Sequence, residues 1–226
     1  MRCRTQIFVL GIFISLFSCS SLVRLGQNGP LVKRKDIEKG FRPILHFMDV
    51  RPGDTFADVG AASGNSTIAM STLLENVKIY IEDIDSIHLK EKRLNRIINY
   101  YSRQCKRDLR KQNQYFLIVG GVFHTNLPDN SFDVIHTNAT IHVFQSPDSI
   151  LQDMSRKLKT TGILFVRDEF RGDHGVGAFC SYPKCGRRLY SIDEVLALMT
   201  RNGFKLAKQS ADVSGYPVFG FSKGNL

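Results

Sequence analysis

From about residue 35 to its C-terminus, the chain alternates short apolar runs with longer amphipathic stretches. The short runs have the length of β-strands, and the longer stretches repeat their apolar residues at helical spacing. Strands that alternate with helices predict a mostly parallel sheet covered by helices on both faces. The sequence therefore predicts an α/β fold.

The pattern also predicts individual elements. The expected strands cover residues 55–59, 77–81, 116–119, 132–136 and 162–167, followed by a hairpin of residues 204–208 and 218–221. The expected helices cover residues 36–48, 65–75, 86–111, 147–158 and 191–202. We expect the first helix to be interrupted near Gly40 and to restart at Pro43. Ser86 is expected to cap the third helix, and Ser191 with Glu194 forms a capping box for the last.

The first 21 residues have the pattern of a signal peptide. Arg2 and Arg4 precede an apolar run over residues 7–17, which is too short to cross a bilayer core of about 30 Å. The run ends in Leu16-Phe17-Ser18-Cys19, which resembles the cleavage box of bacterial lipoproteins, where the cysteine becomes the lipidated N-terminus. We therefore predict a membrane-attached protein of the bacterial cell envelope, held through Cys19 and placed on the periplasmic face. An ordinary signal peptide and an uncleaved anchor stay open as alternatives.

The remaining boundaries follow from composition. Basic residues (Arg24 and residues 33–35) come soon after the apolar run, and because positive charge is retained on the cytoplasmic side, the side of the membrane stays open. Residues 22–34 contain Gly26, Gly29 and Pro30 and are typical of a linker. Residues 35–226 then form one domain, which suits a chain of 226 residues.

A turn of small residues follows the first expected strand, in the stretch Asp58-Val59-Gly60-Ala61-Ala62-Ser63-Gly64-Asn65. Gly60, Ala62 and Gly64 leave room for a ligand to approach the backbone. The dinucleotide fingerprint G-x-G-x-x-G is not satisfied, because Asn65 stands where its third glycine would be. The carboxylate of Asp58, beside this turn, would repel a phosphate and attract a cation.

The second expected strand ends in acidic residues, Glu82-Asp83-Ile84-Asp85. A carboxylate at this place can accept hydrogen bonds from both hydroxyls of a ribose. The alternative is a solvated strand end at which Asp85 helps to cap the next helix. Two further segments lead into expected strands. Residues 127–135, L-P-D-N-S-F-D-V-I, are a turn followed by a strand, and residues 156–164, R-K-L-K-T-T-G-I-L, are a helix end, a turn and a strand.

Together, these four segments resemble the class I S-adenosylmethionine-dependent methyltransferases, of the small "type 11" kind, over about residues 40–222. The resemblance implies a Rossmann-like sheet of seven strands with a final antiparallel strand, and S-adenosyl-L-methionine as cofactor. It implies that Gly60, Ala62 and Gly64 shape the cofactor loop, that Asp58 lies near the methionine ammonium, and that Asp83 holds the ribose. The family's polar adenine contact after strand three is replaced here by Gly120-Gly121-Val122-Phe123-His124, so Phe123 is expected to pack on the adenine ring. Asn138 completes the expected cofactor-binding set.

The acceptor side is expected after strand four, in Thr137-Asn138-Ala139-Thr140-Ile141-His142. Methyl transfer from a sulfonium needs a positioned nucleophile, and a base only when the acceptor arrives protonated. His142 is the candidate general base, and a structural histidine is the alternative. Asp168 and Glu169 end strand five and either bind a cationic acceptor or cap the sheet. No N-P-P-Y-type motif of amide methylation is present.

Two cysteines, Cys180 and Cys185, lie in the basic loop FCSYPKCGRR. They form a small disulfide loop in an oxidising compartment or stay as thiols in the cytoplasm. Together with His174 they offer three potential ligands at no recognised spacing, so no metal is predicted. Cys105 is expected inside a helix.

The chain carries 31 Lys and Arg against 21 Asp and Glu, a formal net charge of +10. Nine of the basic residues fall between Lys90 and Lys111. A solvated helix face is one interpretation, and contact with an anionic membrane surface is the other. RNA ranks lower because few aromatic residues are interleaved with the charges.

The predicted function is S-adenosylmethionine-dependent methyl transfer to an unidentified small-molecule or lipid-like acceptor. A non-catalytic binding module on the same fold is one alternative, and export favours it because the cofactor is made in the cytoplasm. A nucleic-acid methyltransferase is the other, and it predicts binding with a steep salt dependence.

Overall fold

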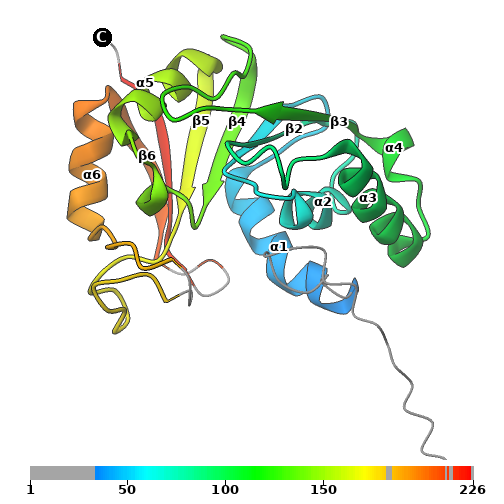
Figure 1. Cartoon of the computed structure of the whole chain (residues 1–226), viewed down its shortest axis with the longest axis horizontal. Helices are drawn as coiled ribbons and strands as arrows, with labels where there is room; N and C mark the ends of the chain where they lie inside the picture. Colours follow the sequence, from blue (N-terminus) through cyan, green and yellow to red (C-terminus); the bar gives the residue numbers. More distant parts are fainter. Residues whose placement is uncertain (1–33, 182–184, 212, 214–215, 225–226) are drawn as a thin grey trace, which may run out of the picture.

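The computed structural model of the chain describes residues 34–181, 185–211, 213 and 216–224. Within these residues, seven strands form one sheet in the order β3-β2-β1-β4-β5-β7-β6. Figure 1 shows this sheet running through the molecule with helices on both sides. The predicted signal peptide (1–21) and linker (22–34) lie, apart from Arg34, outside the described residues.

The first five strands are parallel to one another, and the last two form the predicted hairpin. Strand β7 lies antiparallel between β5 and β6. The strands are β1 (Thr55–Val59), β2 (Lys78–Asp83), β3 (Gln114–Val119), β4 (Phe132–Asn138), β5 (Leu158–Arg167), β6 (Phe204–Ser210) and β7 (Val218–Lys223). The predicted Rossmann-like α/β fold, with its antiparallel final strand, is confirmed.

Two apolar layers cover the sheet. Residues of α1, α2 and α3, such as Ile44, Ile68 and Ile97, pack on one face, and residues of α5 and α6, such as Leu151 and Leu198, pack on the other. The helices are α1 (Arg34–Met48), α2 (Asn65–Ser71), α3 (Glu91–Cys105), α4 (Leu109–Gln112), α5 (Pro147–Lys157), α6 (Ile192–Arg201) and a 3-10 turn, η1 (Ile141–Val143). The capping box of Ser191 and Glu194 at the start of α6 is present as predicted.

The predicted break in the first helix is wrong. Helix α1 runs without interruption through Gly40 and Pro43. A proline inside a helix removes one backbone hydrogen bond, which usually bends or breaks the helix. Here Ile37 and Ile44, on either side of the expected break, are both buried in the core, so tertiary packing keeps the helix whole.

The predicted long helix over 86–111 is two helices, and Ser86 does not cap either of them. The Asp85 side chain accepts the amide proton of Ile87 and lies beside His88, which holds a turn ahead of α3. Lys106 adopts a left-handed conformation that ends α3, and the Asp108 side chain caps α4 by accepting the amide proton of Arg110. Helix α2 also ends earlier than predicted, at Ser71.

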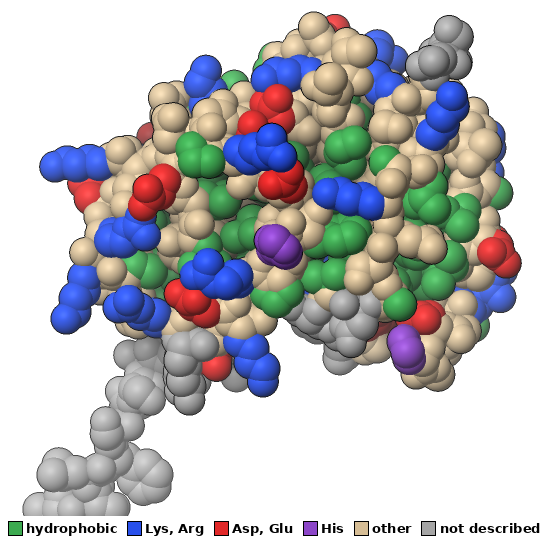
Figure 2. Space-filling model, turned by 180° about the vertical axis from the view of Figure 1, so that it is seen from behind, with side chains coloured by type: hydrophobic (Ala, Val, Ile, Leu, Met, Phe, Trp, Pro, Cys, Tyr) green, Lys and Arg blue, Asp and Glu red, His purple; other side chains and the backbone are tan. Residues whose placement is uncertain are grey.

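The basic residues between Lys90 and Lys111 lie mostly at the surface. Seven of the nine are exposed, and Arg93 and Arg107 are half-buried. Figure 2 shows Lys and Arg side chains, mixed with Asp and Glu, over the end of the molecule that holds α3 and α4. Among the described residues, no helix combines the length and the apolarity that a membrane span requires.

Candidate functional site

The carboxyl ends of β1, β2, β4 and β5 meet at one edge of the sheet. The chain leaves β1 toward β2 on one side, while β4 and β5 lie on the other side. Ligands in open α/β sheets bind at such a reversal of strand order, outside the carboxyl ends. The predicted site residues lie near the carboxyl ends of these four strands, or in the loops that follow them and the neighbouring β3.

The small-residue turn after β1 is shaped by positive φ angles. Gly60 has φ +76° and Gly64 has φ +73°, a region that favours glycine. A Cβ atom on Gly60 would lie 2.1 Å from Cγ2 of Thr140, so the turn lies directly against the segment after β4. The amides of Gly60 and Ala61 both donate to the main-chain carbonyl of Glu82, at 3.0 and 2.9 Å.

Asp83 ends β2 facing this turn. Its Oδ2 atom accepts the amide proton of Ala62 at 2.6 Å, and its Oδ1 atom accepts that of Asp85 at 2.8 Å. Asp83 is half-buried, so part of its carboxylate stays accessible. The structure therefore brings Gly60, Ala62 and Asp83 together, and their roles at the cofactor stay predictions.

Asp58 lies beneath the turn. It is buried, its Oδ2 atom accepts the Thr67 hydroxyl proton, and its Oδ1 atom lies 3.0 Å from Nδ1 of His136. These contacts tie β1 to α2 and to β4. Its predicted role beside the methionine ammonium stays a prediction.

Glu82 is a buried carboxyl that the sequence did not single out from its acidic neighbours. Burial raises its pKa to about 8, against the opposing effect of the Gly60 amide, and the nearby Asp83 carboxylate raises it further. A Cβ atom on Gly120 would lie 1.7 Å from Oε1 of Glu82, so a larger residue there would displace the Glu82 carboxyl. In the same loop the Phe123 ring is 63% exposed and open to a ligand, and its contact with adenine stays a prediction.

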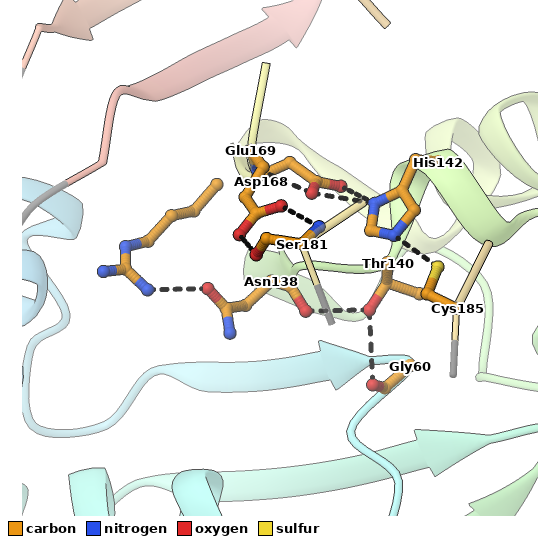
Figure 3. Close-up of polar contacts among 9 residues, drawn as sticks. Gly60, Asn138, Thr140, His142, Asp168, Glu169, Ser181 and Cys185 are labelled. Atoms are coloured by element: carbon orange, nitrogen blue, oxygen red, sulfur yellow. Dashed lines mark hydrogen bonds and ion pairs between the residues drawn. The ribbon is translucent and has the colours of Figure 1, made fainter. Parts of the chain in front are cut away.

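Side chains at the end of β4 and just after it contact β5 on one side and the turn after β1 on the other. The Asn138 side chain accepts a hydrogen bond from Arg167 of β5 at 2.8 Å. The Thr140 hydroxyl donates to the Asn138 carbonyl at 2.8 Å and lies 3.4 Å from the Gly60 carbonyl, as Figure 3 shows. Asn138 therefore borders the cofactor turn through Thr140, which sequence reasoning did not single out.

His142 and Asp168 form a buried pair. Nδ1 of His142 lies 2.8 and 2.9 Å from the two Asp168 carboxylate oxygens, and Nε2 lies 3.4 Å from Sγ of Cys185. Burial alone would lower the pKa of His142, but the hydrogen bond and charge of Asp168, with the nearby Cys185, outweigh it and raise that pKa. A general base needs an accessible nitrogen, and the remaining nitrogen faces Cys185, so the catalytic role of His142 stays a prediction.

The histidine that lies beside the two cysteines is His142, and not His174, which the sequence pattern grouped with them without predicting a metal site. His142, Cys180 and Cys185 place their ligand atoms within 4.8 Å of one another. His174 points to solvent, with a side chain 76% exposed. Cys180 and Cys185 are not joined by a disulfide. No sequence spacing signals this cluster, because 43 positions separate His142 from Cys185.

Comparison with known proteins agrees with this geometry. A family model described as "Methyltransferase domain" matches residues 57–166. A wheat (Triticum aestivum) phosphoethanolamine N-methyltransferase is 25% identical over 166 residues, which span 72% of this chain and 30% of the wheat protein. The chain thus corresponds to less than a third of that relative's length.

Solved structures share the fold. A "SAM dependent methyltransferase" from Aquifex aeolicus has a TM-score of 0.61 at 21% identity, covering 84% of this chain and 96% of that one. A methyltransferase from Methanosarcina mazei has a TM-score of 0.60 at 16% identity, covering 80% and 97%. The cyclase SpnF has a TM-score of 0.62 at 16% identity, covering 83% and 81%.

The residues present fit the cofactor that this family and fold imply, S-adenosyl-L-methionine. Its ribose needs acceptors for its hydroxyl protons, and the carboxylate of Asp83 at the end of β2 would supply them. The turn beside Asp83 carries no bulky side chain at Gly60, where even a methyl group would collide with Thr140. The chain therefore has the fold of the class I S-adenosylmethionine-dependent methyltransferases, and residues 57–166 match the model of a methyltransferase domain.

Proposed function

We propose that this protein transfers the methyl group of S-adenosyl-L-methionine to a small-molecule or lipid-like acceptor. One observation carries the proposal. The Gly60 turn, the Asp83 carboxylate and the segment after β4 lie together where the strand order reverses, between β1 and β4. The cofactor and the methyl acceptor can then bind next to each other at one edge of the sheet.

The chain's own residues would do the positioning. The cofactor supplies an electrophilic methyl group on a positively charged sulfur. Asp83 would hold the ribose, while Gly60, Ala62 and Gly64 would let the backbone approach the ligand, and Phe123 would cover the adenine. The segment Asn138–His142 would line the acceptor side, where holding a nucleophile close to the methyl group provides most of the rate enhancement.

The proposed acceptor class is supported by the wheat relative, whose name states N-methylation of phosphoethanolamine. That molecule is a small phosphorylated amine. The half-buried carboxylate of Glu169 accepts hydrogen bonds from the backbone and hydroxyl of Ser181 at the same strand end as Asp168, and it is the proposed contact for a cationic acceptor.

Calorimetric titration with S-adenosylhomocysteine tests the proposal. We expect micromolar affinity for the purified chain, and about 10- to 100-fold weaker binding for Asp83→Ala, because hydrogen bonds to a charged group are lost. Asp193→Ala, which removes an exposed carboxylate from α6, is the matched control and should bind as the wild type does. An absence of binding at millimolar ligand would contradict the proposal.

A second candidate is a different reaction, or binding alone, on the same fold. The similarity to the cyclase SpnF favours considering it, because one fold can host several chemistries. Incubation of the protein with methyl-labelled cofactor and a panel of small phosphorylated amines distinguishes methyl transfer from the second candidate function. Labelled product supports methyl transfer, whereas tight cofactor binding without any product across acceptor classes supports the second candidate.

We also propose that the chain works at an anionic membrane surface, held by a lipidated Cys19 and by the exposed basic residues between Lys90 and Lys111. The number and exposure of these residues support the proposal, since each adds about 1 kcal/mol near an anionic surface. Mass spectrometry of Cys19 tests lipidation. Flotation of the non-lipidated Cys19→Ser chain with phosphatidylglycerol vesicles, against phosphatidylcholine vesicles, tests the basic surface, and equal binding to both would contradict it.

A further inference from the structure

Three side chains with metal-binding atoms converge beside β4 and β5. His142 comes from η1, while Cys180 and Cys185 come from the segment between β5 and α6, and their ligand atoms lie within 4.8 Å of one another. Nε2 of His142 lies 3.4 Å from Sγ of Cys185. A tetrahedral zinc site, with Zn–S of about 2.3 Å and Zn–N of about 2.0 Å, separates these two atoms by about 3.5 Å. The spacing of this pair is therefore that of two ligands of one zinc ion, and the third ligand atom, Sγ of Cys180, lies within 4.8 Å of both.

The histidine is oriented for this role. Both carboxylate oxygens of Asp168 lie within 2.9 Å of Nδ1 of His142, and the two side chains are 4% and 1% exposed. Metal-bound histidines in proteins commonly donate their second ring N–H to a carboxylate, which fixes the tautomer and makes the other nitrogen the ligand. Asp168 therefore leaves Nε2, the atom that faces Cys185, to bind an ion.

The cysteines are also held in place. Phe179 and Arg188 form an antiparallel bridge, flanked by hydrogen bonds from Cys180 to the carbonyl of Arg187 and from Leu189 to the carbonyl of Ala178, both at 2.9 Å. Glu169 accepts the amide proton of Ser181 at 2.9 Å and also its hydroxyl proton. The paired residues around Phe179 and Arg188 form a short stem, and the contact of Ser181 with Glu169 anchors it. Together they hold both thiols near His142, as Figure 3 shows for Cys185.

From this geometry we propose that His142, Cys180 and Cys185 bind one Zn²⁺ ion, with Asp168 as the positioning residue of His142. Thiolate and imidazole ligands select zinc over magnesium or calcium, which prefer oxygen. Binding converts the two thiols to thiolates and releases their protons, with no change of oxidation state. Three protein ligands leave the fourth position for water or another ligand, as in catalytic zinc sites. Both cysteines are partly exposed, which gives the ion a path of entry.

Zinc binding is measured on the full chain, reduced and stripped with a chelator, by competition with a chromogenic zinc indicator and by metal analysis after dialysis. We expect one zinc per chain. Cys180→Ser, Cys185→Ser and His142→Ala should each weaken binding by at least about 100-fold, and Asp168→Asn by about 10- to 100-fold. Cys105→Ser and His174→Ala remove the same residue types elsewhere and should bind zinc as the wild type does.

A second measurement uses only the wild-type chain, so it does not depend on variants that fold. Zinc should protect Cys180 and Cys185, but not Cys105, from alkylation mapped by mass spectrometry. Cadmium in place of zinc should produce the ultraviolet charge-transfer band of thiolate ligation. Reduced protein in which both thiols react equally with and without zinc would overturn the proposal. So would a chain that forms a Cys180–Cys185 disulfide in air and takes up no zinc after reduction.

Discussion

The two halves of the candidate site are built in different ways. The cofactor half lies within residues 58–85 and relies on the backbone, through the positive φ angles of Gly60 and Gly64 and the amides that bind Asp83 and Glu82. The other half relies on side chains from three separate segments, which bring His142, Asp168 and Cys185 together. The first half therefore needs only the turn conformation and the pairing of the neighbouring strands β1 and β2, whereas the second needs three segments that are far apart in the sequence.

The largest expected effect comes from breaking the cofactor half at Gly60. In Gly60→Ala the new methyl group would collide with Thr140 and the alanine would need a left-handed φ, at a combined cost of about 2–6 kcal/mol, so the turn would move from its present position. We expect more than about 100-fold weaker binding of S-adenosylhomocysteine by calorimetry. Gly40→Ala, where nothing lies within 4 Å of the added atom, is the matched control. Wild-type affinity in Gly60→Ala would show that the turn does not form the cofactor loop.

The next effect concerns Glu82, whose buried carboxyl makes the cofactor half sensitive to pH. Burial raises its pKa in the folded state from 4.5 to about 8, so the folded state holds this proton more tightly than the unfolded state. Its stabilising contribution is present below pH 4.5 and is lost as the pH rises toward about 8. We therefore expect Glu82→Gln to exceed the wild type in free energy of unfolding at pH 9 by about 1–3 kcal/mol, with a smaller difference at pH 5.

Urea unfolding at the two pH values measures this difference. Glu91→Gln changes an exposed carboxylate in the first turn of α3 and is the matched control, for which we expect no such dependence on pH. If Glu82→Gln were as sensitive to alkaline pH as the wild type, the buried carboxyl would not be the titrating group.

The third change, Asp168→Asn, breaks the other half of the site. It should lower the free energy of unfolding, by about as much as Glu82→Gln raises it. The folded-state pKa of His142 is raised, so the pairing stabilises the fold below the ordinary histidine pKa and this stability is lost as the pH rises through the raised value. In chelator-treated protein, Asp168→Asn should lower the His142 pKa, followed by NMR, and should cost about 1.5–3 kcal/mol of stability at pH 5.5, with less at pH 9. Asp173→Asn, beside the exposed His174, is the control. An unchanged His142 titration would refute the pairing.

The smallest effect is expected outside both halves, on the basic surface of α3. Lys92 and Arg96 are exposed on the helix that packs on the sheet through Leu94 and Ile97. Replacing both by serine should change the free energy of unfolding by no more than about 0.5 kcal/mol per residue. Affinity for S-adenosylhomocysteine should stay within about twofold of the wild type, since screened surface charges act weakly at a distance. A large loss of affinity would extend the site to α3.

The order and type of the strands were predictable because each carries its own periodicity and turn residues. Strand β1 and the start of β4 fall where the sequence predicted, and the capping box of α6 is local enough to be read directly. The continuous helix through Pro43 was not predictable, because burial of Ile37 and Ile44 outweighs the local preference of proline. The end of α3 at Cys105 was missed for a related reason: a non-glycine residue, Lys106, adopts the left-handed conformation.

The sequence by itself determined the element order, the small-residue turn and the acidic end of β2, since these depend on neighbours along the chain. The tertiary structure decided which buried groups meet. The β4–β5 pairing, with Asn138 opposite Arg167, brings the residues that follow these strands, His142 and Asp168, to one sheet edge. The stem around Phe179 then places Cys185 against His142. Contacts of this kind depend on strand register and on loop packing, and no spacing in the sequence encodes either of them.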